Sequence, residues 1–190
     1  MKNTIIKCLK DSNSYIRNGV CNKQINLGEK EVLEAARLIS NDILKNYDLE
    51  NDKIGLLGVA RSGLPLLTIV SHYCNQRKVS VMQVQTTASD KIRDFAKETT
   101  YLGEMIQNDV DKFIILEDVV CYGHCSNEVI NRLKKLGKET VAVYTIVMNE
   151  KFENCEYDDP NVILKYVNKT SKDQWIHYFW DKEYQEGSEF

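Results

Sequence analysis

Four stretches of the sequence are apolar at nearly every position, and they constrain the fold more than any other feature. They are residues 54–59 (IGLLGV), 79–84 (VSVMQV), 113–116 (FIIL) and 141–147 (VAVYTIV). A strand that is apolar on both faces must be covered on both faces, which is typical of parallel sheets between layers of helices. The sequence therefore predicts an α/β fold: an open, mostly parallel twisted sheet flanked by helices, with right-handed crossovers.

The segments between these runs have helical periodicity. Residues 28–47 and the segment after 126 carry apolar residues at spacings of three and four, and Pro65 suits the first turn of a helix after residue 63. Gly137 is placed to end the helix that follows residue 126. The apolar positions are Val32, Ala35, Ala36, Ile39 and Ile43 in the first segment and Val129, Ile130, Leu133 and Leu136 in the second.

Length and composition bound the class of protein. The 190 residues form one domain with a net charge of −3, and Lys and Arg are spread along the chain. No basic footprint for nucleic acid is present, and the first residues hold neither a signal-peptide core nor a spanning segment. We expect a cytoplasmic protein that binds neither nucleic acid nor membrane, with its six cysteines as free thiols.

Two parts of the chain depart from the alternation. Residues 85–111 are polar and long, and they predict either a functional lid or a solvated hairpin or helix. Residues 151–190, which include an aromatic cluster, predict a small hood that joins the N-terminal segment beside a core of about residues 28–150. Residues 1–190 are then a single domain.

An acidic pair follows the third apolar run. Glu117 and Asp118 are expected at the carboxyl end of a strand, where open parallel sheets bind ligands. Two adjacent carboxylates buried without partners cost on the order of several kcal/mol, so they need donors, a cation or ligand hydroxyls. The vicinal hydroxyls of a sugar meet this need, although a plain turn and helix-cap pair is the alternative.

The loop after the pair leads directly into a helix. It comprises Cys121, Tyr122, Gly123, His124, Cys125 and Ser126. Amides at a helix amino terminus favour an anion, and a glycine permits close backbone approach. Acids for a diol next to amides for a phosphate indicate a phosphorylated ribose. A zinc site at the cysteines and His124 is not expected, because the cluster lacks a second ligand pair at zinc-site spacing.

These residues carry a resemblance to a known family. FIILEDVVCYGHCSNEVI resembles the phosphoribosyl-diphosphate (PRPP) signature of the type I phosphoribosyltransferases, and LLGVARSGLPLL resembles their pyrophosphate loop. DQWIHYFWDKE is similar to the base-binding segment of the xanthine-guanine and hypoxanthine-guanine enzymes. The three motifs occur in the family's order, and the similarity spans about residues 30–185.

The resemblance implies a role for each matching residue. Glu117 and Asp118 bind the ribose hydroxyls and, with Cys121, form the catalytic set, while the 121–126 loop holds the 5′-phosphate. Arg61, Ser62 and Gly63 contact pyrophosphate, and residues 85–111 close over the reacting centre. Trp175 stacks on the base, the backbone of Ile176 contacts the base edge, and Asp181 approaches pyrophosphate-bound Mg²⁺, the implied cofactor. Trp180 is expected to serve in packing instead.

Several positions differ from the family pattern. Cys121 stands where the purine enzymes commonly have an Asp near the base, and a thiol is a poor replacement for a carboxylate. Tyr122, His124 and Cys125 replace small hydroxyl residues or Lys. The Lys that reads the purine 6-oxo group is missing, which leaves Asn149 as the candidate for a base edge.

The resulting prediction is a homodimeric or homotetrameric enzyme of purine salvage. It transfers a phosphoribosyl group from PRPP to a purine-like heterocycle and releases pyrophosphate. The alternative is a non-catalytic protein of the same fold that binds PRPP or a nucleotide in a regulatory role.

Overall fold

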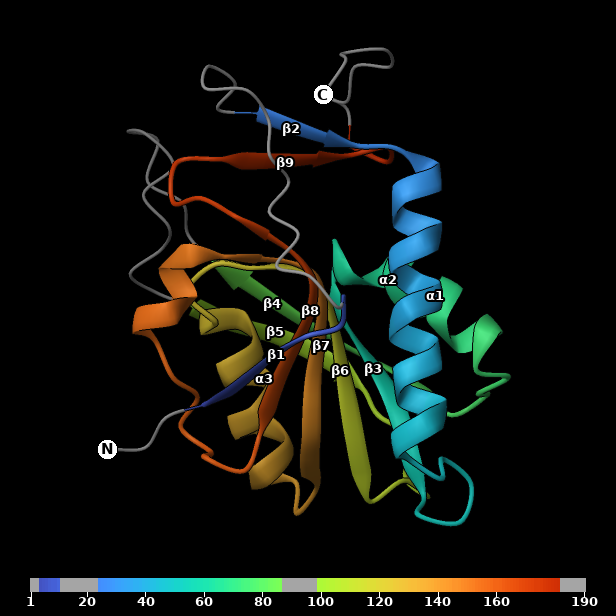
Figure 1. Ribbon diagram of the computed structural model, residues 1–190. Coiled ribbons are helices and arrows are strands. Elements are labelled where there is room, and N and C mark those ends of the chain that lie inside the picture. Colours follow the sequence, from blue (N-terminus) through green and yellow to red (C-terminus); the bar gives the residue numbers. More distant parts are fainter. Residues whose placement is uncertain (1–3, 11–23, 87–98, 182–190) are drawn as a thin grey trace.

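The protein consists of one large open sheet covered by helices and one small sheet above it (Figure 1). The computed structural model describes residues 4–10, 24–86 and 99–181. The seven-stranded sheet has the order β1-β8-β7-β6-β3-β4-β5. Its strands are β1 (Ile5–Cys8), β3 (Ile54–Ala60), β4 (Val79–Thr86), β5 (Thr99–Met105), β6 (Lys112–Val120), β7 (Glu139–Asn149) and β8 (Ile163–Thr170).

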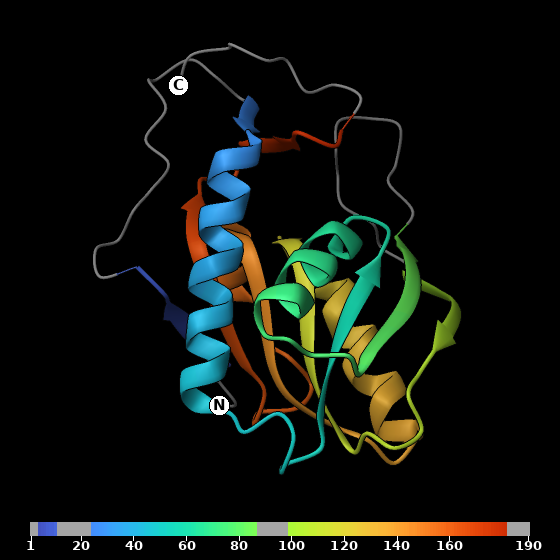
Figure 2. The same ribbon diagram turned by 90° about the vertical axis from the view of Figure 1, so that its right-hand side faces the viewer.

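The helices cover both faces of this sheet. They are α1 (Glu29–Asn46), α2 (Gly63–Tyr73), α3 (His124–Lys135) and the short 3-10 helix η1 (Glu150–Asn154). Figure 2 shows α1 and α2 on one side of the sheet and α3 on the other. All neighbouring strands of the large sheet pair in parallel except β4 and β5, which confirms the predicted fold class.

Strand β6 is longer than its apolar run. Its pairing with β7 continues through Val119↔Val147 and Val120↔Met148, so Glu117 and Asp118 lie within the strand. The expectation that the acids follow the strand end is therefore wrong by a few residues. Backbone pairing to β7 outweighs the change in side-chain polarity at position 117.

The polar segment 85–111 contains an edge strand. After β4, residues 87–98 lie outside the described part, and β5 then pairs antiparallel with β4, with Gln85 opposite Thr100. The hairpin alternative is thus the one observed at residues 99–105. An edge strand needs no uniform apolar run, which is why this segment resembled an insertion.

The small sheet, which we call the hood, pairs β2 (Gln24–Leu27) with β9 (Trp175–Tyr178). It stands above the large sheet in Figure 1, and a single residue, Gly28, separates β2 from α1. The prediction that residues 151–190 all belong to the hood is wrong for β8, which pairs with β7 and β1 in the large sheet.

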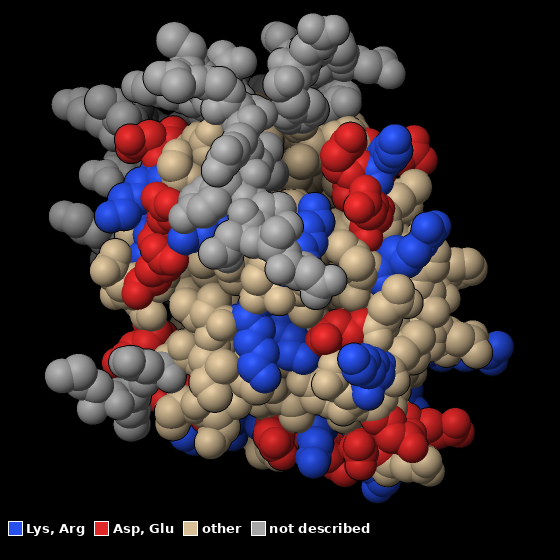
Figure 3. Space-filling view, in the orientation of Figure 1, with Lys and Arg blue, Asp and Glu red and all other residues tan. Residues whose placement is uncertain are grey.

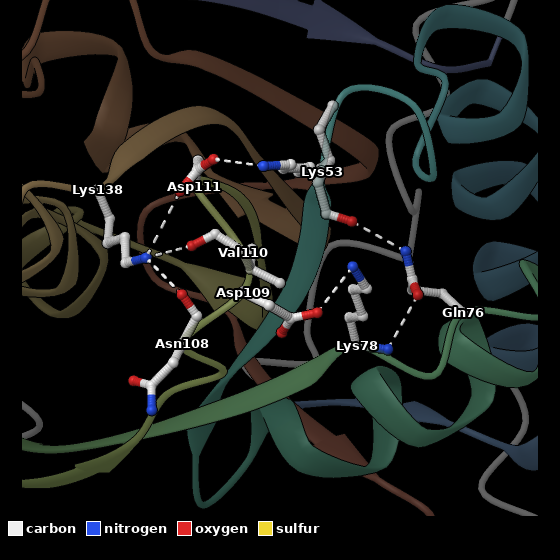
Figure 4. Close-up of polar contacts among 9 residues, drawn as sticks. Lys53, Gln76, Lys78, Asn108, Asp109, Val110, Asp111 and Lys138 are labelled. Atoms are coloured by element: carbon white, nitrogen blue, oxygen red, sulfur yellow. Dashed lines mark hydrogen bonds and ion pairs between the residues drawn. The ribbon is translucent and has the colours of Figure 1, made fainter.

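The opposite end of the large sheet is held by polar contacts around the β5–β6 connection (Figure 4). Lys138 Nζ donates to the carbonyls of Val110 and of Asn108, the latter at 3.2 Å, and lies 3.8 Å from Asp111. Lys78 pairs with Asp109 at 2.9 Å. These charged groups contact one another or backbone carbonyls. Their role at this end of the sheet is therefore structural.

The surface charge, the helix lengths and the cysteines of the described residues complete the description of the fold. On the face drawn in Figure 3, acidic and basic side chains are interspersed. No helix in the described ranges is long and apolar enough to cross a membrane. The five cysteines outside the masked segments, Cys8, Cys74, Cys121, Cys125 and Cys155, are free thiols.

Candidate functional site

The two acids of β6 point to opposite faces of the sheet. Leu116 packs in the core cluster that contains α1 and α2, and Ile115 packs in the cluster that contains α3. Successive side chains of a strand alternate between faces, which places Glu117 on the α3 side and Asp118 on the α1 and α2 side. Each carboxylate therefore has its own surroundings.

Glu117 lies under the first turn of α3. Its side chain accepts a hydrogen bond from the Ser126 hydroxyl, and only 7% of the residue is exposed. Burial raises the pKa of Glu117 to about 8; the Ser126 hydrogen bond opposes this rise, and the charge of Asp118 adds to it. The side chain is thus mainly protonated at neutral pH.

Asp118 lies beside the loop that opens α2. Burial raises its pKa to about 6, a hydrogen bond from Ser62 lowers it, and the nearby charge of Asp181 raises it. Asp118 is therefore largely ionised at pH 7 even though it is only 5% exposed. The site thus brings together Asp118 of β6, Ser62 of the β3–α2 loop and Asp181, which follows the hood strand β9.

Gly123 has a conformation and a position that require glycine. Its φ of 73° is left-handed, and a Cβ built there meets Phe152 Cε2 at 2.5 Å. No side chain caps the amino end of α3, which begins at the next residue. The helix dipole and the amides of its first turn favour an anion at this point.

The side chains of the 121–126 loop form a stacked group with a cation. Tyr122 stacks on His124 with ring centres 5.7 Å apart, and Lys151 Nζ lies 5.3 Å from the Tyr122 ring centre. Burial raises the pKa of Cys121 to about 12, although the charge of Lys151 lowers it. Cys121 is therefore a neutral thiol beside a lysine.

Lys151 is a candidate residue that the sequence motifs did not identify. It belongs to η1, which follows β7 directly and turns the chain back toward the 121–126 loop. No local sequence signal identifies this return, because it depends on the length of β7 and on the 3-10 turn.

The predicted pyrophosphate loop lies next to the acid strand because β3 and β6 are neighbours. Arg61 and Ser62 are exposed at its tip, and the Ala60–Arg61 peptide bond is cis. A Cβ on Gly63 meets the Leu116 carbonyl oxygen at 2.6 Å, so a glycine is required for α2 to begin this close to β6. Arg61, Ser62 and Gly63 thus occupy the side of β6 that carries Asp118.

The hood strand divides the predicted base-binding residues. Ile176 and Tyr178 pack into the cluster with α1, whereas Trp175 lies on the other face of β9 by alternation and is half-buried. The ring of Trp180 stacks on that of Tyr178, with ring centres 4.7 Å apart, in agreement with the packing role expected of Trp180. Base stacking by Trp175 stays a prediction.

Asn149 is held within the protein. Its amide nitrogen donates to the Ser171 carbonyl at 2.8 Å and lies 3.3 Å from Thr170 Oγ1, and its oxygen accepts from the Lys151 amide at 3.0 Å. These bonds join β7 to the chain after β8 and cap η1. The geometry favours a structural role for Asn149 over contact with a base.

Asp181 suits an ion that a phosphate ligand carries. One oxygen of Asp181 accepts from the Tyr178 amide at 2.8 Å, and its charge reaches Asp118. Among the described residues no group of three or more His, Cys, Asp or Glu side chains can hold a metal alone. Mg²⁺ usually takes one or two protein carboxylates together with phosphate oxygens and waters, and a single carboxylate such as that of Asp181 fits that pattern.

No protein-family model matches the sequence, and a search of the curated proteins found no match. Solved structures do match. A purine phosphoribosyltransferase from Pyrococcus horikoshii Ot3 shares 20% identity and a TM-score of 0.63, covering 85% of this chain and 95% of that one. A Neisseria gonorrhoeae hypothetical protein with bound ppGpp shares 13% identity and a TM-score of 0.64, covering 85% and 90%.

A third similar structure is the xanthine-guanine-hypoxanthine phosphoribosyltransferase of Helicobacter pylori, at 12% identity and a TM-score of 0.59, covering 83% of this chain and 91% of that one. At these identities the likeness establishes the fold. This chain has the fold of the phosphoribosyltransferases, and the resemblance inferred from its motifs is confirmed at that level.

Proposed function

We propose that this protein transfers a phosphoribosyl group from PRPP to a nucleobase-like heterocycle and releases pyrophosphate. The observation that carries the proposal is the position of Asp118, a buried carboxylate beside the loop that opens α2 and on the strand that leads to α3. The shared fold supports the same reaction class.

Each end of PRPP has a matching group around Asp118. The uncapped amino end of α3 suits the 5′-phosphate, and the exposed Arg61 and Ser62 suit the pyrophosphate. Asp118, with a pKa of about 6, is largely ionised at pH 7 and accepts hydrogen bonds from a ribose hydroxyl. Three separate elements thus align a sugar between two anionic groups.

The reaction breaks the bond from ribose C1 to pyrophosphate and forms a bond from C1 to a ring nitrogen. Its transition state has oxocarbenium character, so the protein acts by holding the sugar, the leaving group and the acceptor in line and by excluding water. Asp181 would hold Mg²⁺ together with PRPP, and the ion would supply neutralisation of the charge on pyrophosphate. The chain itself forms no covalent intermediate.

The acceptor is purine-like in this proposal, with Trp175 stacking on it. Cys121 has a pKa of about 12, so it does not accept a proton from the acceptor nitrogen at neutral pH. Lys151 lies close enough to act on Cys121 electrostatically and favours an acceptor with electron-rich or anionic edges. Trp175→Ala should raise KM for the acceptor about tenfold while changing KM for PRPP by less than about twofold.

The direct test is pyrophosphate release from PRPP and Mg²⁺ against a panel of purines, pyrimidines and other heterocycles. Asp118→Asn should reduce kcat/KM at least about a hundredfold and leave the circular dichroism spectrum intact. Asp109→Asn is the matched control, because Asp109 is an exposed acid at the far end of the sheet. Turnover of Asp118→Asn equal to that of the control contradicts the proposal.

A second function is favoured by one comparison and one departure from the family pattern. The Neisseria gonorrhoeae protein of this fold has bound ppGpp. In this chain Cys121 stands where the purine enzymes commonly have an Asp. A non-catalytic nucleotide-binding protein predicts calorimetric binding of PRPP or ppGpp without pyrophosphate release on any base. Release with one acceptor of the panel excludes it.

A further inference from the structure

We infer that Glu117 positions the phosphate-binding loop through Ser126, and that Asp118 alone of the acidic pair binds the ribose hydroxyls. This inference rests on the proposed function and narrows it. It assigns different tasks to two adjacent acids that the motif treats as a pair.

The side chains of Glu117 and Asp118 point in different directions. Glu117 and Asp118 are consecutive residues of β6, and their side chains have partners on different elements: Glu117 accepts from Ser126 of α3, and Asp118 accepts from Ser62 before α2. Their side chains therefore leave opposite faces of the sheet. A diol seated against Ser62 and Asp181 lies on the Asp118 face, and the sheet backbone separates it from the Glu117 carboxyl.

Glu117 is covered by the first turn of α3 and the loop before it. Ser126, in the first turn of α3, is fully buried and donates its hydroxyl proton to Glu117 Oε2. The preceding Gly123 packs on the same side, where its Cβ position is 2.5 Å from Phe152 and 3.1 Å from Tyr157. Glu117 thus lies beneath the loop, between β6 and α3, and the loop separates it from a phosphate at the helix end.

The surroundings of Glu117 favour a neutral carboxyl group. The groups that face Glu117 are Asp118 on its own strand, Ser126, and Cys121, Tyr157 and Tyr178, on whose pKa values its charge acts. No ion pair joins it to a Lys, Arg or His within the described ranges. A neutral carboxyl is accommodated in such a place, whereas an ionised one beneath a phosphate site repels the ligand.

The variant Glu117→Gln imitates the protonated form of Glu117. Gln reproduces the shape of a protonated Glu and keeps an oxygen that accepts from Ser126. Glu117→Gln should therefore bind PRPP and ribose 5-phosphate within about threefold of wild type at pH 7, whereas Asp118→Asn loses at least about a hundredfold. Isothermal titration calorimetry with both ligands measures this without requiring turnover.

The pH profile distinguishes positioning from a purely structural role. Above about pH 8 the protonated form of Glu117 becomes about tenfold rarer with each pH unit. The affinity of the wild-type protein for ribose 5-phosphate should decrease in the same proportion. Glu117→Gln should show no such decline. Equal declines in the two proteins overturn the inference, as does a loss in Glu117→Gln at pH 7 as large as that in Asp118→Asn.

Sugar recognition provides a second measurement on a separate variant. Ser126→Ala removes the bond from the loop to Glu117 and should weaken ribose 5-phosphate about threefold to tenfold. It should keep the wild-type preference for ribose 5-phosphate over 2,3-dideoxyribose 5-phosphate, which Asp118→Asn should abolish. Loss of this preference in Ser126→Ala or Glu117→Gln, with the preference kept in Asp118→Asn, reverses the assignment.

Failure of the proposed function has a different signature. A wild-type protein that binds neither PRPP nor ribose 5-phosphate at any pH overturns the phosphoribosyl site together with this inference. Binding without pyrophosphate release leaves the division of roles intact and supports the non-catalytic alternative instead.

Discussion

The hydroxyl of Tyr178 donates a hydrogen bond of 2.7 Å to the backbone carbonyl of Asp118, 60 residues away in the sequence. The bond joins the hood strand β9 to the strand that carries the acids. Thr145 Oγ1 of β7 lies 2.9 Å from the same carbonyl oxygen and 3.0 Å from that of Val147, so its hydroxyl proton is shared between these two acceptors. The backbone at Asp118 is thus fixed from the hood and from β7 at once.

Tyr178→Phe should therefore disturb ligand binding as well as stability. The variant keeps the stacking on Trp180 but loses the hood contact with Asp118. We expect a loss of about 1 kcal/mol in the free energy of unfolding and a rise of about threefold to tenfold in KM for PRPP. Urea denaturation and steady-state kinetics measure the two effects. The exposed Tyr73 supplies the control Tyr73→Phe, and equal KM values in both variants contradict this role for the hood.

Two glycines with the same backbone conformation allow the loop contact to be isolated. Gly123 has φ 73° and Gly137 has φ 71°, but only Gly123 has neighbours at its Cβ position, since nothing lies within 4 Å of that of Gly137. Gly137→Ala should cost about 1–2 kcal/mol of unfolding free energy from backbone conformation alone.

Gly123→Ala adds the clash with Phe152 to the same backbone cost. It should be less stable than Gly137→Ala by at least about 1 kcal/mol and should bind ribose 5-phosphate at least about tenfold more weakly. Thermal unfolding and calorimetry of both variants measure the difference. Equal stability and equal affinity in the two variants would show that the contact of Gly123 with Phe152 is unimportant.

The sequence predicted the elements whose side chains are covered on both faces. Continuous apolar runs predict β3, β4, β6 and β7, and the spacing of three and four predicts α1. The strands β1 and β2 have four residues each. Strand β1 alternates between exposed and half-buried residues, and β2 has two buried residues, Ile25 and Leu27, so each pattern is too short for a signal. Strand β5 lies at the edge of the large sheet, where a strand needs no uniform apolar run.

Prediction of the site was limited by the end of one strand. The apolar run suggests that β6 stops before Glu117, and from that position two acids can point into one cleft. The strand instead continues to Val120, and the two-residue period of a strand then separates the side chains. The approach of Lys151 to Tyr122 depends on a 3-10 turn and has no sequence signature.

A buried cluster anchors α1, the helix that follows the hood strand β2. Lys165 Nζ is 2.6 Å from Asp42 Oδ2 and 3.0 Å from the Tyr144 hydroxyl, which itself donates to Asp42 at 2.7 Å. Burial opposes ionisation of Asp42, but the hydrogen bonds and charge of Lys165 and the bond from Tyr144 together lower its pKa.

Lys165→Met should cost on the order of 3 kcal/mol of unfolding free energy, because it leaves a partly buried carboxylate without its cation. Asp109→Asn removes an ion pair on the surface, in which the side chain of Asp109 is 64% exposed and that of Lys78 is 36% exposed. This change should reduce the free energy of unfolding by less than about 1 kcal/mol. Urea denaturation at neutral pH compares the two. Similar losses indicate that the α1 cluster is no more important than a surface pair.

Glu117 should make the folded protein less stable as the pH rises. Its pKa is raised to about 8 in the folded state, so between its ordinary pKa of 4.5 and about 8 the folded protein binds a proton that the unfolded chain has released. The unfolding free energy then falls with pH by about 1.4 kcal/mol per unit for one group, and the decline ends above the folded pKa. Glu117→Gln should remove this contribution.

Glu104 is a control of opposite sign. Hydrogen bonds from Arg132 lower its pKa, so its contribution is present above its ordinary pKa and is lost as the pH falls. Glu104→Gln should therefore reduce stability at neutral pH and leave the decline toward pH 8 unchanged. Thermal unfolding of the three proteins across this range measures the slopes, and the same slope in wild type and Glu117→Gln shows that Glu117 is ionised in the folded state.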